Sequence, residues 1–111
     1  SESVFLTKAI ELVEKNLHVP GYSVEQLSRD LCMERTGLYR KLVAMLDQSP
    51  SLFIRNIRLQ RAAQLILEGS LSITEIAERT GFSSSSYLSK CFQEMYGCRP
   101  SEYAEKMQKS T

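Results

Sequence analysis

The chain has 111 residues, of which 42% are hydrophobic, and a formal net charge of +1. This length and composition fit one domain with a buried core, and no apolar run approaches the roughly 20 residues needed to cross a bilayer. Three cysteines without a C-x-x-C spacing, a single histidine and a start unlike a signal peptide argue against a disulfide framework, a metal site and secretion. We therefore expect a cytoplasmic domain that holds no metal or cofactor and makes no contact with a membrane.

A first helix is predicted close to the N-terminus, where apolar residues recur at helical spacing. They are Phe5, Ala9, Leu12, Val13 and Leu17. Pro20 and Gly21 follow, and we expect them to end this helix. Ser23 with Gln26 then has the form of a capping box, which predicts that a second helix begins there. Strand-like alternation of apolar and polar residues is absent from the sequence, so helices alone are expected.

The sequence contains an internal repeat, in which one pattern of capping and apolar residues occurs twice. Ser72 with Glu75 forms a second capping-box pattern 49 residues after the first, and further along the chain the matching residues lie 50 apart. The pairs at that distance are Leu38 with Leu88, Arg40 with Lys90, Leu42 with Phe92, Leu46 with Tyr96, Pro50 with Pro100 and Phe53 with Tyr103. Each copy predicts a short capped helix, a turn of about four residues and a second helix, which is the helix-turn-helix pattern.

A long helix is predicted between the two copies. Ser49 and Pro50 are a favourable N-cap and first-turn pair, and apolar residues at helical spacing continue to a stop near Gly69. About 18 residues at about 1.5 Å each span roughly 27 Å, close to the ~34 Å between successive major-groove faces of B-DNA. We predict one DNA-binding domain over 1–111, made of helix-turn-helix subdomains over 4–48 and 69–108 and a linker helix over 49–68.

Charge is distributed unevenly along the chain. Between positions 35 and 61, six basic residues face one acid, Asp47, which gives a local charge of +5. From 72 to 111, five basic residues are cancelled by five acids. A local basic face can bind phosphates without a basic chain as a whole, although a solvated helix surface explains the same pattern.

The motifs resemble those of the AraC/XylS family of bacterial transcription regulators, from about Val4 to Met107. They are Phe53-Ile54, Arg58-Leu59, Ala62-Ala63, Ile73, Ile76-Ala77, Gly81-Phe82, Tyr87-Leu88-Ser89-Lys90, Phe92, Gly97 and Pro100-Ser101-Glu102-Tyr103. The resemblance implies an all-α fold of seven helices, in which two helix-turn-helix subdomains are joined by a long central helix. The stretches 35–42 and 48–50 are further similar to domains attached to hybrid two-component sensors of gut Bacteroidetes.

The resemblance implies that the second helix of each subdomain enters the major groove. The base contacts expected from motif position are Arg35, Thr36, Tyr39 and Arg40 in the first subdomain and Ser85, Ser86, Ser89 and Lys90 in the second. Arg40 is the best candidate for direct readout, because a guanidinium can bind the O6 and N7 edge of guanine with two hydrogen bonds. Serines discriminate weakly between bases, so the first subdomain should supply most of the affinity and specificity.

The expected phosphate contacts are Ser23, Lys41, Arg55, Arg61 and Ser72. Alternatives remain open for several of these side chains. Ser23 and Ser72 are structural first, as helix caps, and the arginines could instead form intramolecular salt bridges. Tyr39 could be buried against the preceding helix, and Arg40 could contact a phosphate or solvent. Arg58 is more readily structural, because it precedes a core residue.

One position departs from the second copy and from the family pattern. Asp47 stands where the second copy has Gly97, at the end of a reading helix where we expect the chain to turn through positive φ. Asp tolerates that conformation better than most residues, so the turn should survive with some strain.

Partners and further functions follow from the resemblance. It implies double-stranded DNA and RNA polymerase as partners, and a homodimeric, longer protein of which this segment is the C-terminal output module. With a hybrid sensor attached, that protein would be anchored in the membrane and respond to carbohydrate. A helical module that binds protein instead of DNA is the alternative, favoured by the near-neutral second half. An enzyme is disfavoured because no catalytic constellation is present, and a ligand pocket of several hundred cubic ångströms is not expected in units this thin.

Overall fold

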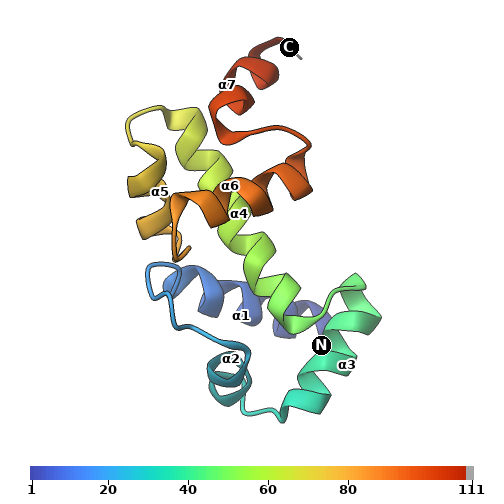
Figure 1. Ribbon diagram of the computed structural model, residues 1–111. Helices are drawn as coiled ribbons and strands as arrows, with labels where there is room; N and C mark the ends of the chain where they lie inside the picture. The colour runs from blue at the N-terminus through green and yellow to red at the C-terminus, as the bar shows by residue number, and fades with distance from the viewer. Residues whose placement is uncertain (110–111) are drawn as a thin grey trace. The chain divides into compact units, whose positions relative to one another are not determined.

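The computed structural model describes residues 1–109, and every regular element in that part of the chain is an α-helix (Figure 1). The helices are α1 (Glu2–Lys15), α2 (Val24–Asp30), α3 (Arg35–Leu46), α4 (Pro50–Glu68), α5 (Ile73–Arg79), α6 (Ser85–Tyr96) and α7 (Pro100–Lys109). The chain divides within α4 into two compact units, of which the first is Ser1–Ile57 and the second begins at Arg58. Residues 110 and 111 of the predicted domain lie outside the described residues.

The first unit contains α1, α2, α3 and the start of α4. Its apolar side chains converge on one buried cluster, to which α4 contributes Phe53, Ile54 and Ile57. The other members are Ala9, Val13, Leu17, Tyr22, Leu27, Leu38 and Leu42. Because α2 and α3 each place one stripe of side chains in this cluster, their other faces lie at the surface.

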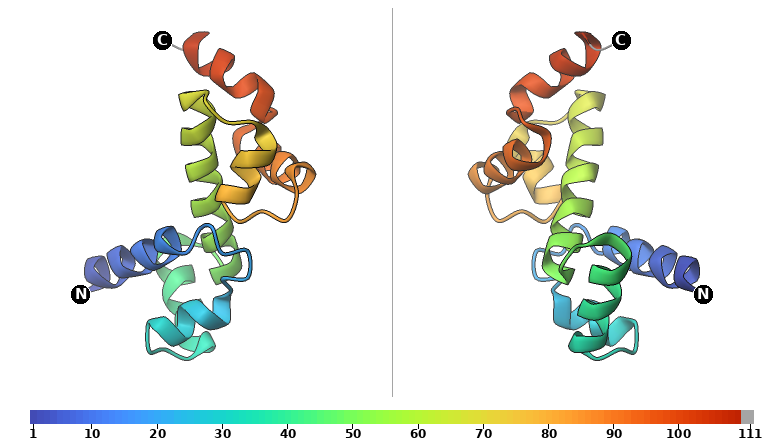
Figure 2. Two further views of the ribbon diagram at one scale, coloured as in Figure 1. Left: turned by 90° about the vertical axis from the view of Figure 1, so that its left-hand side faces the viewer. Right: turned by 90° about the vertical axis from the view of Figure 1, so that its right-hand side faces the viewer.

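The second unit contains the rest of α4 and α5 to α7, and Figure 2 shows α5 beside α6 within it. Its buried residues are Leu59, Ala62, Ala63, Leu65, Ile76, Ala77, Phe82, Leu88, Cys91, Phe92 and Cys98. Three aromatic rings pack against one another in this unit, with centroids 4.5 Å apart for Phe92 and Tyr96, 5.2 Å for Phe92 and Tyr103, and 5.1 Å for Tyr96 and Tyr103. Burial, and then the nearby Tyr103, raise the pKa of Tyr96.

Both predicted capping boxes are present. The Gln26 N–H donates to Ser23 Oγ at 3.3 Å and the Ser23 N–H donates to Gln26 Oε1 at 3.1 Å. In the second unit the Glu75 N–H donates to Ser72 Oγ at 3.1 Å and the Ser72 N–H donates to Glu75 Oε1 at 3.0 Å. These bonds satisfy backbone donors that have no partner within a helix. The hydrogen bond from the Ser72 backbone N–H, and then that with its side chain, lower the pKa of the Glu75 carboxyl.

The long linker helix also begins where the sequence predicts. Ser49 caps α4 through a bond from the Leu52 N–H to its Oγ at 3.3 Å, and Pro50 is the first helical residue. The first helix, in contrast, ends earlier than expected. α1 stops at Lys15, because the Asn16 side chain donates to the Leu12 carbonyl at 2.7 Å and closes the last turn before Pro20 is reached.

The turns of the two units use the same backbone conformations with different residues. After α3 and after α6 the chain passes through positive φ, at Asp47 (56°) and Gly97 (75°), as predicted for Asp47. In the turn between α2 and α3, Cys32 has φ 56°, and in the turn between α5 and α6, Gly81 has φ 79°. The positive φ of Cys32 was not foreseen. A glycine adopts this region freely, whereas a residue with a Cβ is strained there, so both strained turns belong to the first unit.

The architecture confirms the predicted fold class. Residues 1–109 contain two helix-turn-helix motifs, α2 with α3 in the first unit and α5 with α6 in the second, and α4 contributes side chains to both cores. None of the helices in this described range combines the length and the apolar character needed to cross a membrane.

Candidate nucleic-acid interface

In the first unit the second helix of the helix-turn-helix is α3, which has an exposed polar face. Leu38 and Leu42 are fully buried, and this fixes which side of the helix faces the core. The predicted base-contact residues of this helix, Arg35, Thr36, Tyr39 and Arg40, are all exposed. Their spacing of one and four residues places them on one continuous stripe of the helix surface.

Tyr39 decides one of the alternatives left open by the sequence. Its side chain is 53% exposed, so burial against the preceding helix does not occur. A large aromatic side chain is thus presented beside Arg40, where it can stack or donate a hydrogen bond through its hydroxyl.

In the second unit the second helix of the helix-turn-helix is α6, and fewer of its predicted contact residues are exposed than in α3. Ser84 caps it by accepting the Tyr87 N–H at 3.0 Å. Of the predicted contacts, Ser86 and Lys90 are exposed, while Ser85 and Ser89 are half-buried. The structure therefore brings all four residues to one helix but leaves only two of them fully at the surface.

Tyr87 is a surface residue of α6 that the sequence reasoning did not select. Its side chain is 45% exposed, and its ring centroid lies 5.9 Å from that of Phe82. The buried neighbour Leu88 could have revealed it, because a residue next to a fully buried helical position commonly lies at the edge of the exposed face.

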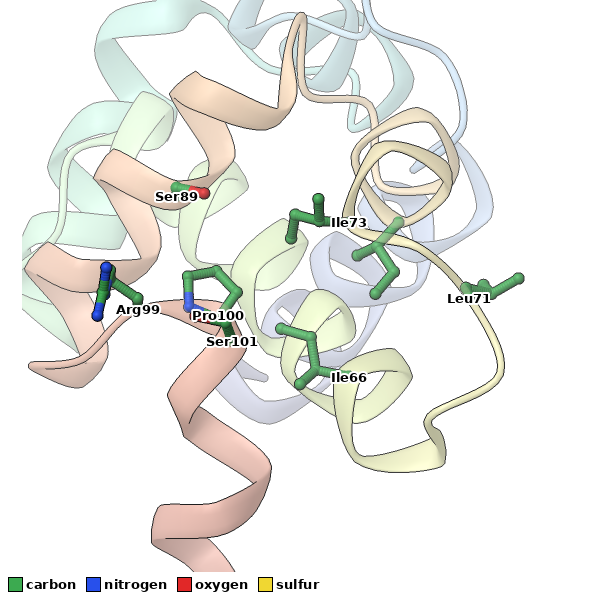
Figure 3. A pocket seen from close by; sticks show the side chains of 8 residues that line it. Ile66, Leu71, Ile73, Ser89, Arg99, Pro100 and Ser101 are labelled. Carbon is green, nitrogen blue, oxygen red and sulfur yellow. The ribbon is translucent and has the colours of Figure 1, made fainter.

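Ser89 lines a hollow of about 440 Å³ in the second unit (Figure 3). The other lining residues are Ile66, Leu71, Ile73, Ile76, Arg99, Pro100 and Ser101. This hollow is open to solvent and is not an enclosed cavity, so the expectation that units this thin hold no ligand pocket stays a prediction. The two serines on its wall are too short to fill the space between the apolar side chains, which come from α4, the loop before α5, α5 itself and the start of α7.

The one charged residue among those that line this hollow is held by a neighbour. Arg99 Nε donates to Glu102 Oε1 at 3.2 Å, and the Arg99 backbone N–H donates to the same oxygen at 3.1 Å. These hydrogen bonds hold the pKa of the Glu102 carboxyl below its usual range. Both side chains are largely exposed, at 65% and 51%, so water screens the pair and its contribution to stability is small.

The predicted phosphate contacts occupy different environments. Ser23 and Ser72 are exposed, but their hydroxyls accept helix N–H groups, which confirms that they are helix caps first. Lys41 is half-buried, with Nζ 4.5 Å from the centroid of the Phe5 ring, in cation–π geometry. Arg61 is exposed, and its Nη1 donates to Gln64 Oε1 at 2.8 Å.

Two arginines of α4 lie closer to the protein interior. Arg55 is half-buried. Arg58 is only 6% exposed, and its Nη1 donates to the carbonyl oxygen of Thr80 at 2.8 Å. Burial lowers the pKa of the Arg58 guanidinium. The prediction that Arg58 is structural is therefore confirmed.

Within residues 1–109 no group of three or more His, Cys, Asp or Glu side chains could hold a metal ion. The cysteines are free, with Cys91 and Cys98 buried and Cys32 exposed. Cys91 is thus a core thiol of the second unit.

Two helix-turn-helix units, each with polar side chains exposed on its second helix, define a DNA-binding protein of the helix-turn-helix class. A family model described as a helix-turn-helix domain matches residues 27–106. The chain belongs to this family, in its AraC-type branch, as the motifs indicated. Membership confirms that this segment is a DNA-binding domain and not an enzyme.

Known proteins similar to the chain include a histidine kinase and transcriptional regulators. A histidine kinase P4 of Formosa agariphila is 40% identical over 98 residues, which are 88% of this chain and 7% of that protein. The HTH-type transcriptional regulator GbdR of Pseudomonas aeruginosa is 36% identical over 95 residues, covering 86% of this chain and 26% of the regulator. An AraC-type DNA-binding transcriptional regulator of Chromobacterium violaceum has a crystal structure with a TM-score of 0.85 and 30% identity, covering 94% of this chain and 92% of that one. The chain spans about a third or less of the curated relatives it matches.

Proposed function

We propose that the chain binds double-stranded DNA in a sequence-specific manner to regulate transcription, with α3 and α6 reading successive major grooves. The observation that carries the proposal is the stripe of α3, where two basic side chains, a threonine and a tyrosine are exposed opposite fully buried leucines. A helix with this face fits the width of the major groove, and its side chains carry the donors and acceptors that base edges recognise.

The first unit is the main reader in this proposal. Arg40 binds the O6 and N7 edge of a guanine, and Tyr39 or Thr36 contacts a thymine methyl or a phosphate. Arg35, in the first turn of α3, contacts a base near the groove edge. Within this unit, between positions 35 and 57, four basic residues face one acid, and this local charge of +3 draws the unit to the duplex, because neutralised phosphates release counterions.

The second unit adds weaker contacts. Ser86 and Lys90 reach bases from the exposed face of α6, and the half-buried Ser85 and Ser89 do so from its edge. A serine hydroxyl donates and accepts with little preference among bases, so this unit extends the site more than it sharpens it.

Phosphate contacts flank both reading helices. The capped N-termini at Ser23 and Ser72 offer backbone N–H groups to the duplex backbone. Arg61 and Arg55 supply guanidinium groups from α4. Lys41 can keep the Phe5 ring on one side and a phosphate on another, because an ammonium has three donors.

The larger protein belongs to the same proposal. The kinase relative, of which this chain covers 7%, supports a role as the output module of a hybrid two-component regulator. We place that protein, with this module at its C-terminus, at the cytoplasmic face of the membrane as a homodimer. It responds to carbohydrate and acts on RNA polymerase at its promoters.

Selection of binding sites from random duplexes, repeated at several salt concentrations, tests the proposal. We expect a motif with two blocks about one helical turn apart, and affinity that falls linearly with salt on logarithmic axes. A motif with one block would remove α6 as a reader. No enrichment and no binding at low salt would reject DNA binding and favour the protein-interaction module.

A further inference from the structure

Arg58 is a buried cation of the second unit that the contacts proposed above do not use. It lies in α4, and its Nη1 donates to the carbonyl of Thr80, 22 residues further along the chain. Thr80 is fully buried and is the C-cap residue of α5. Its hydroxyl and its backbone N–H both donate to the Ile76 carbonyl, at 2.7 and 3.0 Å, so all three polar groups of this buried residue are bonded within the protein.

The Thr80 carbonyl lies where the chain leaves α5. Carbonyls in the last turn of a helix have no partner within that helix and need another donor when buried. Gly81 follows with φ 79°, and the Phe82 N–H then donates back to the Ala77 carbonyl at 2.9 Å. α6 begins at Ser85. The bond from Arg58 therefore holds the first residue of the short turn between α5 and α6, and this turn sets the direction of α6.

The first unit makes the same turn without such a bond. The spacing of 49 residues that relates the two capping boxes also relates Thr80 to Leu31, which is the C-cap of α2, and Arg58 to Ala9. Alanine has no side-chain donor, so Ala9 cannot bond to the Leu31 carbonyl as Arg58 bonds to that of Thr80. The turn itself is preserved, because the Met33 N–H donates to the Ser28 carbonyl at 2.9 Å. The first unit is thus an internal control for the role of Arg58.

We propose that Arg58 is a positioning residue for α6. By holding the Thr80 carbonyl it fixes the angle between α5 and α6, and so it sets base discrimination by the second unit without touching DNA. The dependence is strong because α6 has few fully exposed polar contacts, and these must be placed accurately to contribute. The part of the proposal that concerns DNA rests on the proposed function, whereas the part that concerns the turn does not.

Amide hydrogen exchange tests the turn without DNA. In Arg58→Met we expect the Phe82 amide to exchange roughly tenfold faster, with the Met33 amide unchanged, because only the second turn loses its support. Arg58→Lys should lie between Arg58→Met and the original chain, since an ammonium can still donate to a carbonyl. Gln60→Met, on the exposed side of α4, should leave both amides unchanged. Equal acceleration of both amides, or of neither, would overturn the proposal. If circular dichroism shows Arg58→Met to be unfolded, the same comparison in Arg58→Lys decides.

Binding to a selected two-block site tests the consequence for recognition. Affinity is measured for the intact site and for two versions with one block scrambled. We expect Arg58→Met to lose roughly tenfold discrimination against the scrambled second block while keeping discrimination at the first. Equal losses at both blocks would make Arg58 a residue of general stability. If the original chain discriminates no site at all, the proposed function fails, and amide exchange still decides whether Arg58 holds the turn.

Discussion

Replacing Cys32 by glycine should stabilise the first unit. Cys32 has φ 56°, and the matching position of the second unit holds Gly81 at φ 79°. A residue with a Cβ costs about 1 to 2 kcal/mol in this region, and glycine costs about 0.5 to 1 kcal/mol in extra chain entropy. The side chain is exposed, so little packing is lost. The net gain in the free energy of unfolding should be about 0.5 to 1 kcal/mol.

Urea unfolding followed by circular dichroism measures this gain as a rise in the midpoint at unchanged slope. Cys32→Ala is the matched control: it removes the thiol but keeps the Cβ and its strain, so its midpoint should not rise. Asp47→Gly, at the other strained turn, should gain less, because aspartate tolerates positive φ better than cysteine does. If Cys32→Ala stabilised as much as Cys32→Gly, the thiol and not the backbone would be the cause, and the reasoning would be refuted.

Three further predictions concern recognition, capping and pH. Arg40→Ala should weaken binding to a selected site by about 1 to 3 kcal/mol, with much less loss on random duplex. Fluorescence anisotropy measures both affinities, with Arg79→Ala as the control variant. Equal losses on both duplexes would make Arg40 a phosphate contact. Glu34→Ser should raise the free energy of unfolding by about 0.5 to 1 kcal/mol, because Glu34 forms no side-chain cap on α3 whereas Ser84 caps α6; an unchanged urea midpoint would contradict this. Burial, then the 2.8 Å hydrogen bond to Asp30 and the charge of that carboxylate, raise the pKa of Tyr22 far above its usual value. The folded state therefore holds the phenol proton more tightly, so this contribution to stability is present below about pH 10 and is lost as the pH rises further. Tyr22→Phe should be about 1 kcal/mol less stable at pH 7 and lose less stability above pH 10, and parallel pH curves for the two chains would disprove the role of the phenol.

The residue pattern alone predicted the helices and which side of each helix is buried. Capping boxes at Ser23 and Ser72 join residues three apart, and apolar spacing reports which side of a helix is buried, so both can be seen in the sequence. The repeat then showed that one arrangement occurs twice. For the same reason the exposed stripe of α3 could be predicted: it lies opposite Leu38 and Leu42, whose burial follows from their spacing.

Features that depend on distant parts of the chain were decided only by the tertiary structure. The bond between Arg58 and Thr80 joins residues 22 apart, and Lys41 of α3 contacts the Phe5 ring of α1. Neither pair can therefore be seen in the spacing of nearby residues. The hollow beside Ser89 and its partial burial depend on how α4, α5, α6 and α7 pack. The strained φ of Cys32 arises because the turn between α2 and α3 must join two packed helices, whatever residue stands there. Local spacing therefore determines helices and faces, whereas packing between helices determines which side chains on those faces are held and which are presented.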